Sequence, residues 1–485
     1  MEMKIEKRDW VFLLLCLVVG VVAEEAFLWD QIGISYFVFI TVFYAIFYWR
    51  FRSFSFSHQR LGYLVLISIW LLALSYYLYD ISMFYALNVL AVPALVIFHL
   101  VLITSPKKME WNKLSFLFYA LLRLGNGILY SFRFVARITG ILKKSSNPKQ
   151  YDVWKKVLIG IAISVPILFV VLNLLASADT QFERLLSNFP NLLSFNPETV
   201  FRFVAILIYT FGFFGFLQVL LHKKIQVVQK EGISTPMALD GIITLTVLLL
   251  LDLVYVLFVA VQFKYFFSGT LESGYTYAQY ARRGFFELLF VTLINLTVTT
   301  VVIPFTKNAL GGLKKTIQLA LTVLVLSSGV LLVSAFMRMA MYEDAYGFTF
   351  TRVLVTSFMI FLMVIFAYTL VKIWLERLSL FHFYFMASII FYTGINLVNF
   401  DQIVVDRNIA RFETTGKIDI HYLNRLSSTG VLGLIDLYEK NPDIPGLEEL
   451  LKQRKADREF IKSDTWQSHN LTRDKAYKKL GQLDL

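Results

Sequence analysis

Cysteine is nearly absent from this sequence: Cys16 is the single one among 485 residues. A lone cysteine excludes a disulfide within the chain and any metal site built from several thiolates. The six histidines are scattered, and no two of them have the spacing of helical metal ligands. We therefore expect no structural zinc, no other metal site and no cofactor.

The sequence also lacks the short motifs of common enzyme classes. It contains no phosphate-binding P-loop, no dinucleotide-binding glycine motif, no HExxH and no GxSxG in a usable context. The net charge of +12 is compatible with nucleic acid, but the basic residues lie mostly between apolar runs and no nucleic-acid-binding motif is present. We expect no nucleic-acid partner, and the sequence favours a function other than catalysis without deciding it.

Apolar residues dominate the composition of the chain. The chain is 57% hydrophobic with a mean hydropathy of +0.64, whereas soluble domains are about 45–50% apolar. The excess lies in runs of about 18–25 residues, the length that crosses a bilayer. The expected spans lie near 10–28, 32–49, 61–79, 82–104, 154–176, 200–221, 241–264, 279–304, 316–337, 348–371 and 380–398. No small-residue cleavage site follows Lys4, Lys7 and Arg8, so the first run is expected to be an uncleaved span.

These runs predict an all-α fold: a polytopic helical membrane bundle of about eleven spans, with a small helical C-terminal extracytoplasmic domain. Lysine and arginine concentrate in alternate connections, which places the N-terminus in the cytoplasm and the C-terminus outside. We expect four N-terminal spans in 1–104, a cytoplasmic amphipathic connection in 105–153, a seven-helix core in 154–398 and an outer helical tail in 399–485.

Two of these regions have further expectations. The connection mixes aromatic and aliphatic residues with spaced arginines. It is expected to form one or two helices that lie either in the membrane interface or packed under the bundle, and both alternatives stay open. In the tail we expect short helices near 418–426, 431–439, 446–458 and 466–480.

Ionisable residues interrupt several spans or lie at their predicted outer ends. A charge inside a membrane helix costs roughly 2.5–3.5 kcal/mol on insertion scales, so each needs a partner, water or a route to the interface. Arg283 and Glu287 are one helical turn apart and can face each other. We predict a charged outer-facing pocket walled by spans seven to ten. The candidate residues are Asp179, Asp252, Arg282, Arg283, Glu287, Arg338, Glu343, Asp344 and Arg352. Arginine–carboxylate pairs that only lock helices together remain the structural alternative.

Four of these segments together carry a family resemblance. They are YARRGFFELL at 280–289, RMAMYEDAYGFTFTR at 338–352, LLASADTQFE at 174–183 and NFDQIVVDRNIARFETTGKIDIHYL at 399–423. In this order they resemble a bacterial membrane family catalogued as a domain of unknown function, number four-one-seven-three, with its sister four-one-five-three. The resemblance covers about residues 155–440. It implies a multi-pass protein of the bacterial plasma membrane and supplies no activity. The chain departs from the family at Leu426-Ser427-Ser428-Thr429-Gly430, where the family pattern has an aspartate after the LS pair.

The leading hypothesis is a bacterial membrane protein that binds or transports a polar or amphipathic solute through the charged outer pocket. One alternative is a scaffold or envelope sensor whose outer tail contacts a membrane or extracytoplasmic protein. Another is an enzyme resembling lipid-linked glycosyltransferases, with Glu24, Glu25 and Asp30 after the first span, although the outer turn there is short. The partner that the sequence predicts directly is the lipid bilayer, and the oligomeric state is not indicated.

Overall fold

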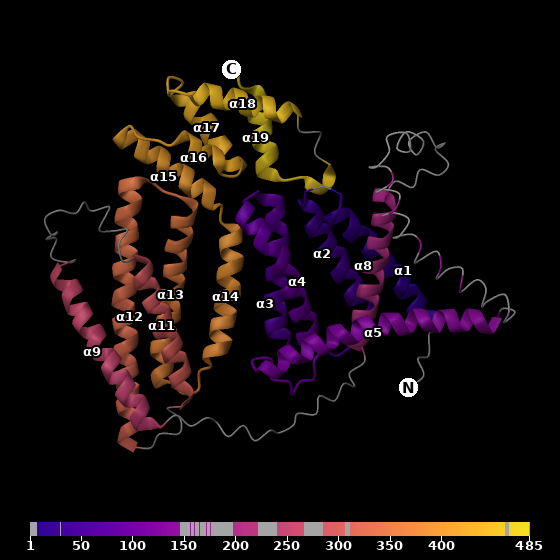
Figure 1. Ribbon diagram of the computed structural model, residues 1–485, viewed down its shortest axis with the longest axis horizontal. Coiled ribbons are helices and arrows are strands. Elements are labelled where there is room, and N and C mark those ends of the chain that lie inside the picture. Colours follow the sequence, from indigo (N-terminus) through magenta and orange to yellow (C-terminus); the bar gives the residue numbers. More distant parts are fainter. Residues whose placement is uncertain are drawn as a thin grey trace. The chain divides into compact units, whose positions relative to one another are not determined.

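Every element that the structure describes is a helix. The structure is a computed structural model that describes residues 7–29, 31–145, 197–221, 240–265, 285–305, 311–460 and 465–484, with five single positions between 156 and 175. Within these residues there is no strand, as Figure 1 shows. The predicted all-α class is therefore confirmed.

Nine helices of the described part are long and apolar enough to cross a membrane. They are α1 (Lys7–Phe27), α3 (Gln59–Leu78), α4 (Ser82–Thr104), α8 (Pro197–Leu221), α9 (Gly241–Tyr265), α11 (Phe285–Phe305), α12 (Gly311–Tyr346), α13 (Phe350–Trp374) and α14 (Leu380–Leu397). A shorter apolar helix, α2 (Ile34–Arg50), follows α1. The expected span at 154–176 and the first residues of the one at 279–304 lie outside the described residues. The chain is thus a multi-pass helical membrane protein.

The chain divides into two compact units. The first comprises Met1–Gly62, Val96–Ile225 and Thr465–Ser468. In it, α1 packs against α2 and α8. A Cβ atom on Gly20 of α1 would lie 2.5 Å from Thr210 Oγ1 and 2.8 Å from Ile206 O of α8. A glycine is therefore what allows these two backbones to approach, as small residues do between membrane helices.

The connection at 105–153 contains one long helix of the first unit, α5 (Leu114–Ser145), which packs on α8. Arg123 is fully buried in this contact, where its guanidinium donates to Tyr119 Oη (2.9 Å) and Val219 O (2.8 Å). Several apolar side chains of α5, among them Leu121 and Phe132, are exposed on the rest of its surface. The helix is therefore amphipathic with one face used for packing, which is compatible with both predicted placements.

The second unit comprises Tyr63–Leu95, Gln226–Asp464 and His469–Leu485. Helix α12 is its central element and packs against α9, α11 and α13. Its 36 residues extend about 54 Å, well beyond a hydrocarbon core of about 30 Å. A buried polar link joins α4 to α14, because Asn88 Nδ2 donates to Asn396 Oδ1 (2.7 Å) and the Tyr392 hydroxyl donates to Asn88 Oδ1 (2.7 Å).

The tail of the second unit consists of short helices around a small core of their own. They are α15 (Phe400–Thr415), α16 (Ile420–Arg425), α17 (Ser428–Lys440), α18 (Leu447–Phe460) and α19 (Leu471–Gln482). Leu434, Ile435 and Leu451 are fully buried among them. Of these helices, α15 was not predicted. Its sequence is polar and has no strong apolar period. Asn399 caps this helix at its N-terminus, and Gly416, with φ of 67°, ends it at the C-terminus.

Candidate functional site

The tail of the second unit is fastened to the ends of its membrane helices by side chains that bind free backbone groups. The last carbonyls and first amides of a helix have no partner inside that helix. At the end of α12, the Arg411 guanidinium donates to Asp344 O (3.2 Å) and Ala345 O (2.8 Å). At the start of α13, the Phe350 N–H donates to the Tyr422 hydroxyl oxygen (2.8 Å). Tail residues therefore cap both helices next to the α12–α13 turn.

The end of α3 is capped in the same way by the segment that starts α19. Asn470 Nδ2 donates to Tyr76 O (2.8 Å), and the Thr472 hydroxyl donates to Leu78 O (2.6 Å). Asn470 and Thr472 are both buried, so these bonds are shielded from water. The C-terminal segment is thus attached to a membrane helix that lies almost 400 residues earlier in the chain.

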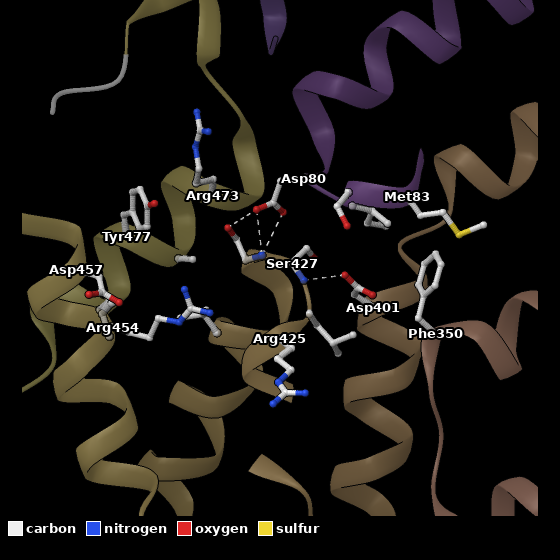
Figure 2. A pocket seen from close by; sticks show the side chains of 17 residues that line it. Asp80, Met83, Phe350, Asp401, Arg425, Ser427, Arg454, Asp457, Arg473 and Tyr477 are labelled. Atoms are coloured by element: carbon white, nitrogen blue, oxygen red, sulfur yellow. Dashed lines mark hydrogen bonds between the residues drawn. The ribbon is translucent and has the colours of Figure 1, made fainter. Parts of the chain in front are cut away.

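The turn between α3 and α4 also contacts the tail, because its Asp80 carboxylate accepts hydrogen bonds from Ser428. The Ser428 N–H donates to Asp80 Oδ1 (3.2 Å) and Oδ2 (3.1 Å), and the Ser428 hydroxyl also donates to Oδ2. The neighbouring Ser427 N–H donates to Asp401 Oδ2 (3.0 Å). These two amides begin α17, so two carboxylates meet the positive end of one helix. Figure 2 shows both contacts as dashed lines.

The two carboxylates differ in their surroundings. Asp401 is only 2% exposed, whereas Asp80 is half-buried. Burial raises the pKa of Asp401, hydrogen bonds from Ser427 oppose this shift, and repulsion from Asp80 adds to it. Because burial raises its pKa, protonation of Asp401 is coupled to folding.

A cavity of about 460 Å³ lies at this junction, entirely within the second unit. Its wall has two sides, as Figure 2 shows: Met83 and Phe350 lie on one, and Arg454, Asp457 and Tyr477 lie on the other. The apolar side continues into packed rings, because Phe350 contacts Phe84 and Phe400 with ring centroids 5.7 and 6.2 Å apart. The cavity is therefore amphipathic, and it lies where membrane helices end and the tail begins.

Three arginines, Arg425, Arg454 and Arg473, line this cavity. Arg454 donates to Asn424 Oδ1 (2.7 Å) and Asn424 O (2.6 Å), which are neutral acceptors. Arg425 is exposed, and among the described residues no carboxylate forms an ion pair with either of these two side chains. Asp80 and Asp401 are already bound by the amides of α17. Asp457 also lines the cavity, but in the part of the chain that the structure describes it forms no ion pair with Arg425 or Arg454, so both guanidinium groups can bind an anionic group.

Several residues of the predicted charged pocket lie around the α12–α13 turn. Arg338 and Glu343 are buried near the end of α12, and Glu343 Oε1 accepts from the Thr356 hydroxyl (3.4 Å). Asp344 is exposed. Arg352, in the first turn of α13, donates to Gly347 O and lies over the Tyr342 ring, 4.1 Å from its centroid. Arg352 therefore stabilises the α12–α13 turn next to it.

Asp252 lies at a different level of the bundle. Helices α9 and α12 start side by side, because a Cβ on Gly241 would lie 2.8 Å from Leu313 Cδ2. Asp252 follows Gly241 on α9 by fewer residues than Arg338 follows Leu313 on α12. With a rise of 1.5 Å per residue, the levels of Asp252 and Arg338 along the bundle differ by roughly 20 Å. Asp252 is buried, and no donor in the described part of the chain reaches its Oδ1.

The remaining predicted residues lie on or beyond α11. Asn295 Nδ2 donates to Ser328 Oγ (2.9 Å), which sets the level of α11 against α12. Glu287, exposed in the first turn of α11, is therefore near the same end as Arg338, but Arg338 is buried. Asp179, Arg282 and Arg283 lie outside the described residues. Whether these residues bind a ligand stays a prediction.

Glu24 and Glu25, in the last turn of α1, belong to the first unit and are held by other side chains. Glu24 is buried and lies 3.5 Å from Arg202 Nε, whose guanidinium stacks over Trp29. Glu25 Oε2 accepts from Gln467 Nε2 (2.6 Å). Asp30 lies outside the described residues. In the part of the chain that the structure describes, no group of three or more His, Cys, Asp or Glu side chains is placed to hold a metal ion.

The residues of this cavity have no strong signal in the sequence and are not among the predicted site residues. Asp80 is the acid of a short turn between two apolar runs, and Ser427-Ser428 opens a helix with a favourable capping residue. Each signal is weak alone, and their pairing spans 348 positions of sequence. The departure from the family pattern after the LS pair falls on Ser428, the residue that binds Asp80.

Comparison with known proteins gives a family and no activity. The profile of a family described as "Domain of unknown function (DUF4153)" matches residues 66–437. The matched family is the one given above as the sister, number four-one-five-three, and not the first-named number four-one-seven-three. No curated protein and no solved structure matches the chain. The matched region covers most of the membrane core and the tail as far as α17, so the chain belongs to the DUF4153 family.

Proposed function

We propose that this membrane protein binds a polar or amphipathic solute with an anionic group in the cavity lined by Arg425 and Arg454. The observation that carries the proposal is the pair of cavity arginines without a carboxylate partner among the described residues. Arginine guanidinium groups bind phosphate and carboxylate with paired hydrogen bonds. The opposite wall, with Met83 and Phe350, suits an apolar part of the same molecule.

The distribution of basic residues supports an outer location for this cavity. Lysine and arginine concentrate in the connections on the other side of the predicted membrane, which makes the tail extracytoplasmic. The ligand then comes from outside the cell or from the outer leaflet of the plasma membrane. Transport of the same solute additionally requires a polar path along the bundle, and Asp252 is the buried carboxylate on which we propose that such a path depends.

The test is retention of an anionic lipid by the purified protein. Native mass spectrometry would count phosphatidylglycerol and phosphatidylcholine molecules bound to wild type, Arg425→Gln and Lys478→Gln. One arginine near an anionic headgroup contributes about 1 kcal/mol, so Arg425→Gln should weaken phosphatidylglycerol binding about fivefold. Lys478 is an exposed base of α19 that does not line the cavity, and its variant should behave as wild type. Equal retention of phosphatidylglycerol by all three proteins would overturn the proposal.

A second candidate function is that of a scaffold that presents the tail to another envelope protein. The observation in its favour is the firm attachment of the tail, through caps on α3, α12 and α13. Substitutions that fill the cavity separate the two functions. Ser82→Trp, at an exposed cavity position, should abolish lipid retention while leaving a tail-dependent partner contact intact.

A further inference from the structure

The cavity does not end at Met83. Met83 belongs to the first turn of α4 and is 44% exposed, and Leu87 and Leu90 of the same helix are 43% and 76% exposed. Positions i, i+4 and i+7 lie on one face of a helix. An apolar stripe therefore begins at the cavity wall and continues along the part of α4 that lies within the membrane span.

The other face of α4 is closed. Phe84 is 5% exposed and packs against Phe350 and Phe400, and Asn88 is buried in its contact with Asn396. The Met83–Leu87–Leu90 stripe is thus the lipid-accessible face of a helix whose packing needs are already met. In the described residues of the second unit, no side chain covers this stripe, so its surface is available to lipid.

We infer that the ligand is an anionic lipid, with its charged headgroup held by Arg425 and Arg454 and its acyl chain lying on the Met83–Leu87–Leu90 stripe. This inference rests on the proposed function, because it names the class of molecule that the cavity takes. Two features argue for it together. The cavity has two arginines that form no ion pair within the described residues at one end, and its apolar wall is continuous with an exposed helix surface at the other.

A soluble anion fits these features less well than a lipid does. A small phosphate or carboxylate compound needs only the arginines and leaves Met83, Phe350 and the α4 stripe unused. A bilayer lipid reaches the cavity sideways from its own leaflet, with the headgroup at the level where the membrane helices end. It therefore fills the charged and the apolar parts of the site at once.

The experiment is photo-crosslinking with phosphatidylglycerol and phosphatidylcholine analogues that carry a diazirine in the acyl chain. The full-length protein would be reconstituted in nanodiscs with each analogue, and the labelled residues mapped by mass spectrometry. Helix α9 supplies the internal control, because Leu253 and Leu257 are 69% and 66% exposed and report bulk lipid. The readout is the ratio of labelling on α4 at Met83–Leu90 to labelling on α9.

We expect this ratio to be about fivefold higher for the phosphatidylglycerol analogue than for the phosphatidylcholine analogue. Arg425→Gln should bring the two ratios together, and Lys478→Gln should leave them apart. Equal ratios for both lipids in the wild type would overturn the inference. If Arg425→Gln still weakens lipid retention while the ratios are equal, the headgroup site stands and the acyl-chain path fails. If retention itself is insensitive to Arg425, the proposed function fails first.

Discussion

Asp80→Ala tests how firmly the tail is held to the membrane helices. The Asp80 carboxylate accepts three hydrogen bonds from Ser428 and acts as a cap supplied to α17 from another part of the chain. Loss of a helix cap costs about 0.5–2 kcal/mol, and a hydrogen bond to a charged group contributes about 1.5–3 kcal/mol. The two ranges overlap near 2 kcal/mol. That value corresponds to a roughly 30-fold larger opening constant for α17.

Hydrogen exchange of the purified protein measures this opening directly. Amides of α17 should exchange about 30-fold faster in Asp80→Ala than in wild type, while α12 should be unaffected. Asp436→Ala is the matched control, because Asp436 is on the same helix and pairs with Lys479 (2.8 Å) at the exposed surface. Exposed pairs contribute about 0–1 kcal/mol, so the control should change exchange less than about fivefold. Equal effects of the two substitutions would refute the reasoning.

Two further predictions concern buried polar groups. Because burial raises the pKa of Asp401, the folded protein holds this proton more tightly than the unfolded chain. Its contribution to stability is complete below the unfolded value of about 4 and is lost as the pH rises through the raised value. Asp401→Asn keeps an oxygen for the Ser427 N–H, so Tm should fall less between pH 4 and pH 8 than in wild type; an unchanged pH profile contradicts this. Asn88→Ala leaves Asn396 and Tyr392 without their partner between α4 and α14. We expect a loss of about 1–3 kcal/mol in thermal unfolding, and a wild-type Tm would argue against the link.

The membrane bundle was predictable because its signal is local. Each span is a continuous apolar run, and most runs end within a few residues of the helices that the structure describes. The exception is α12, which begins five residues before the expected span 316–337 and continues nine residues beyond it, to Tyr346. The exception in the tail, α15, has an amphipathic pattern with few apolar positions. Its boundaries were marked only by Asn399 and Gly416. Local patterns with strong hydropathy therefore gave the fold, and weaker capping signals were missed.

The cavity was not predictable from the same patterns, because its residues are distant in sequence and each lies in a segment where its residue type is common. Asp80 and Ser428 meet across 348 positions, and Arg425 and Arg454 belong to a polar tail where charge is ordinary. Charges inside apolar runs give a stronger signal in the sequence, since they are costly in a membrane. Of these, Arg352 and Glu343 are engaged by their own turn and by Thr356. The cost of burying a charge predicts which residues need a partner. It does not predict which charged side chains at a surface are available to bind a ligand.

A cryo-electron microscopy map of the protein in nanodiscs that contain phosphatidylglycerol tests the central claim most directly. We predict elongated density that begins between Arg425 and Arg454, passes Met83 and follows α4 toward Leu90. The density should be lost in Arg425→Gln and kept in Lys478→Gln. A cavity without such density in the wild type, with lipid density distributed equally over α4 and α9, would contradict the account.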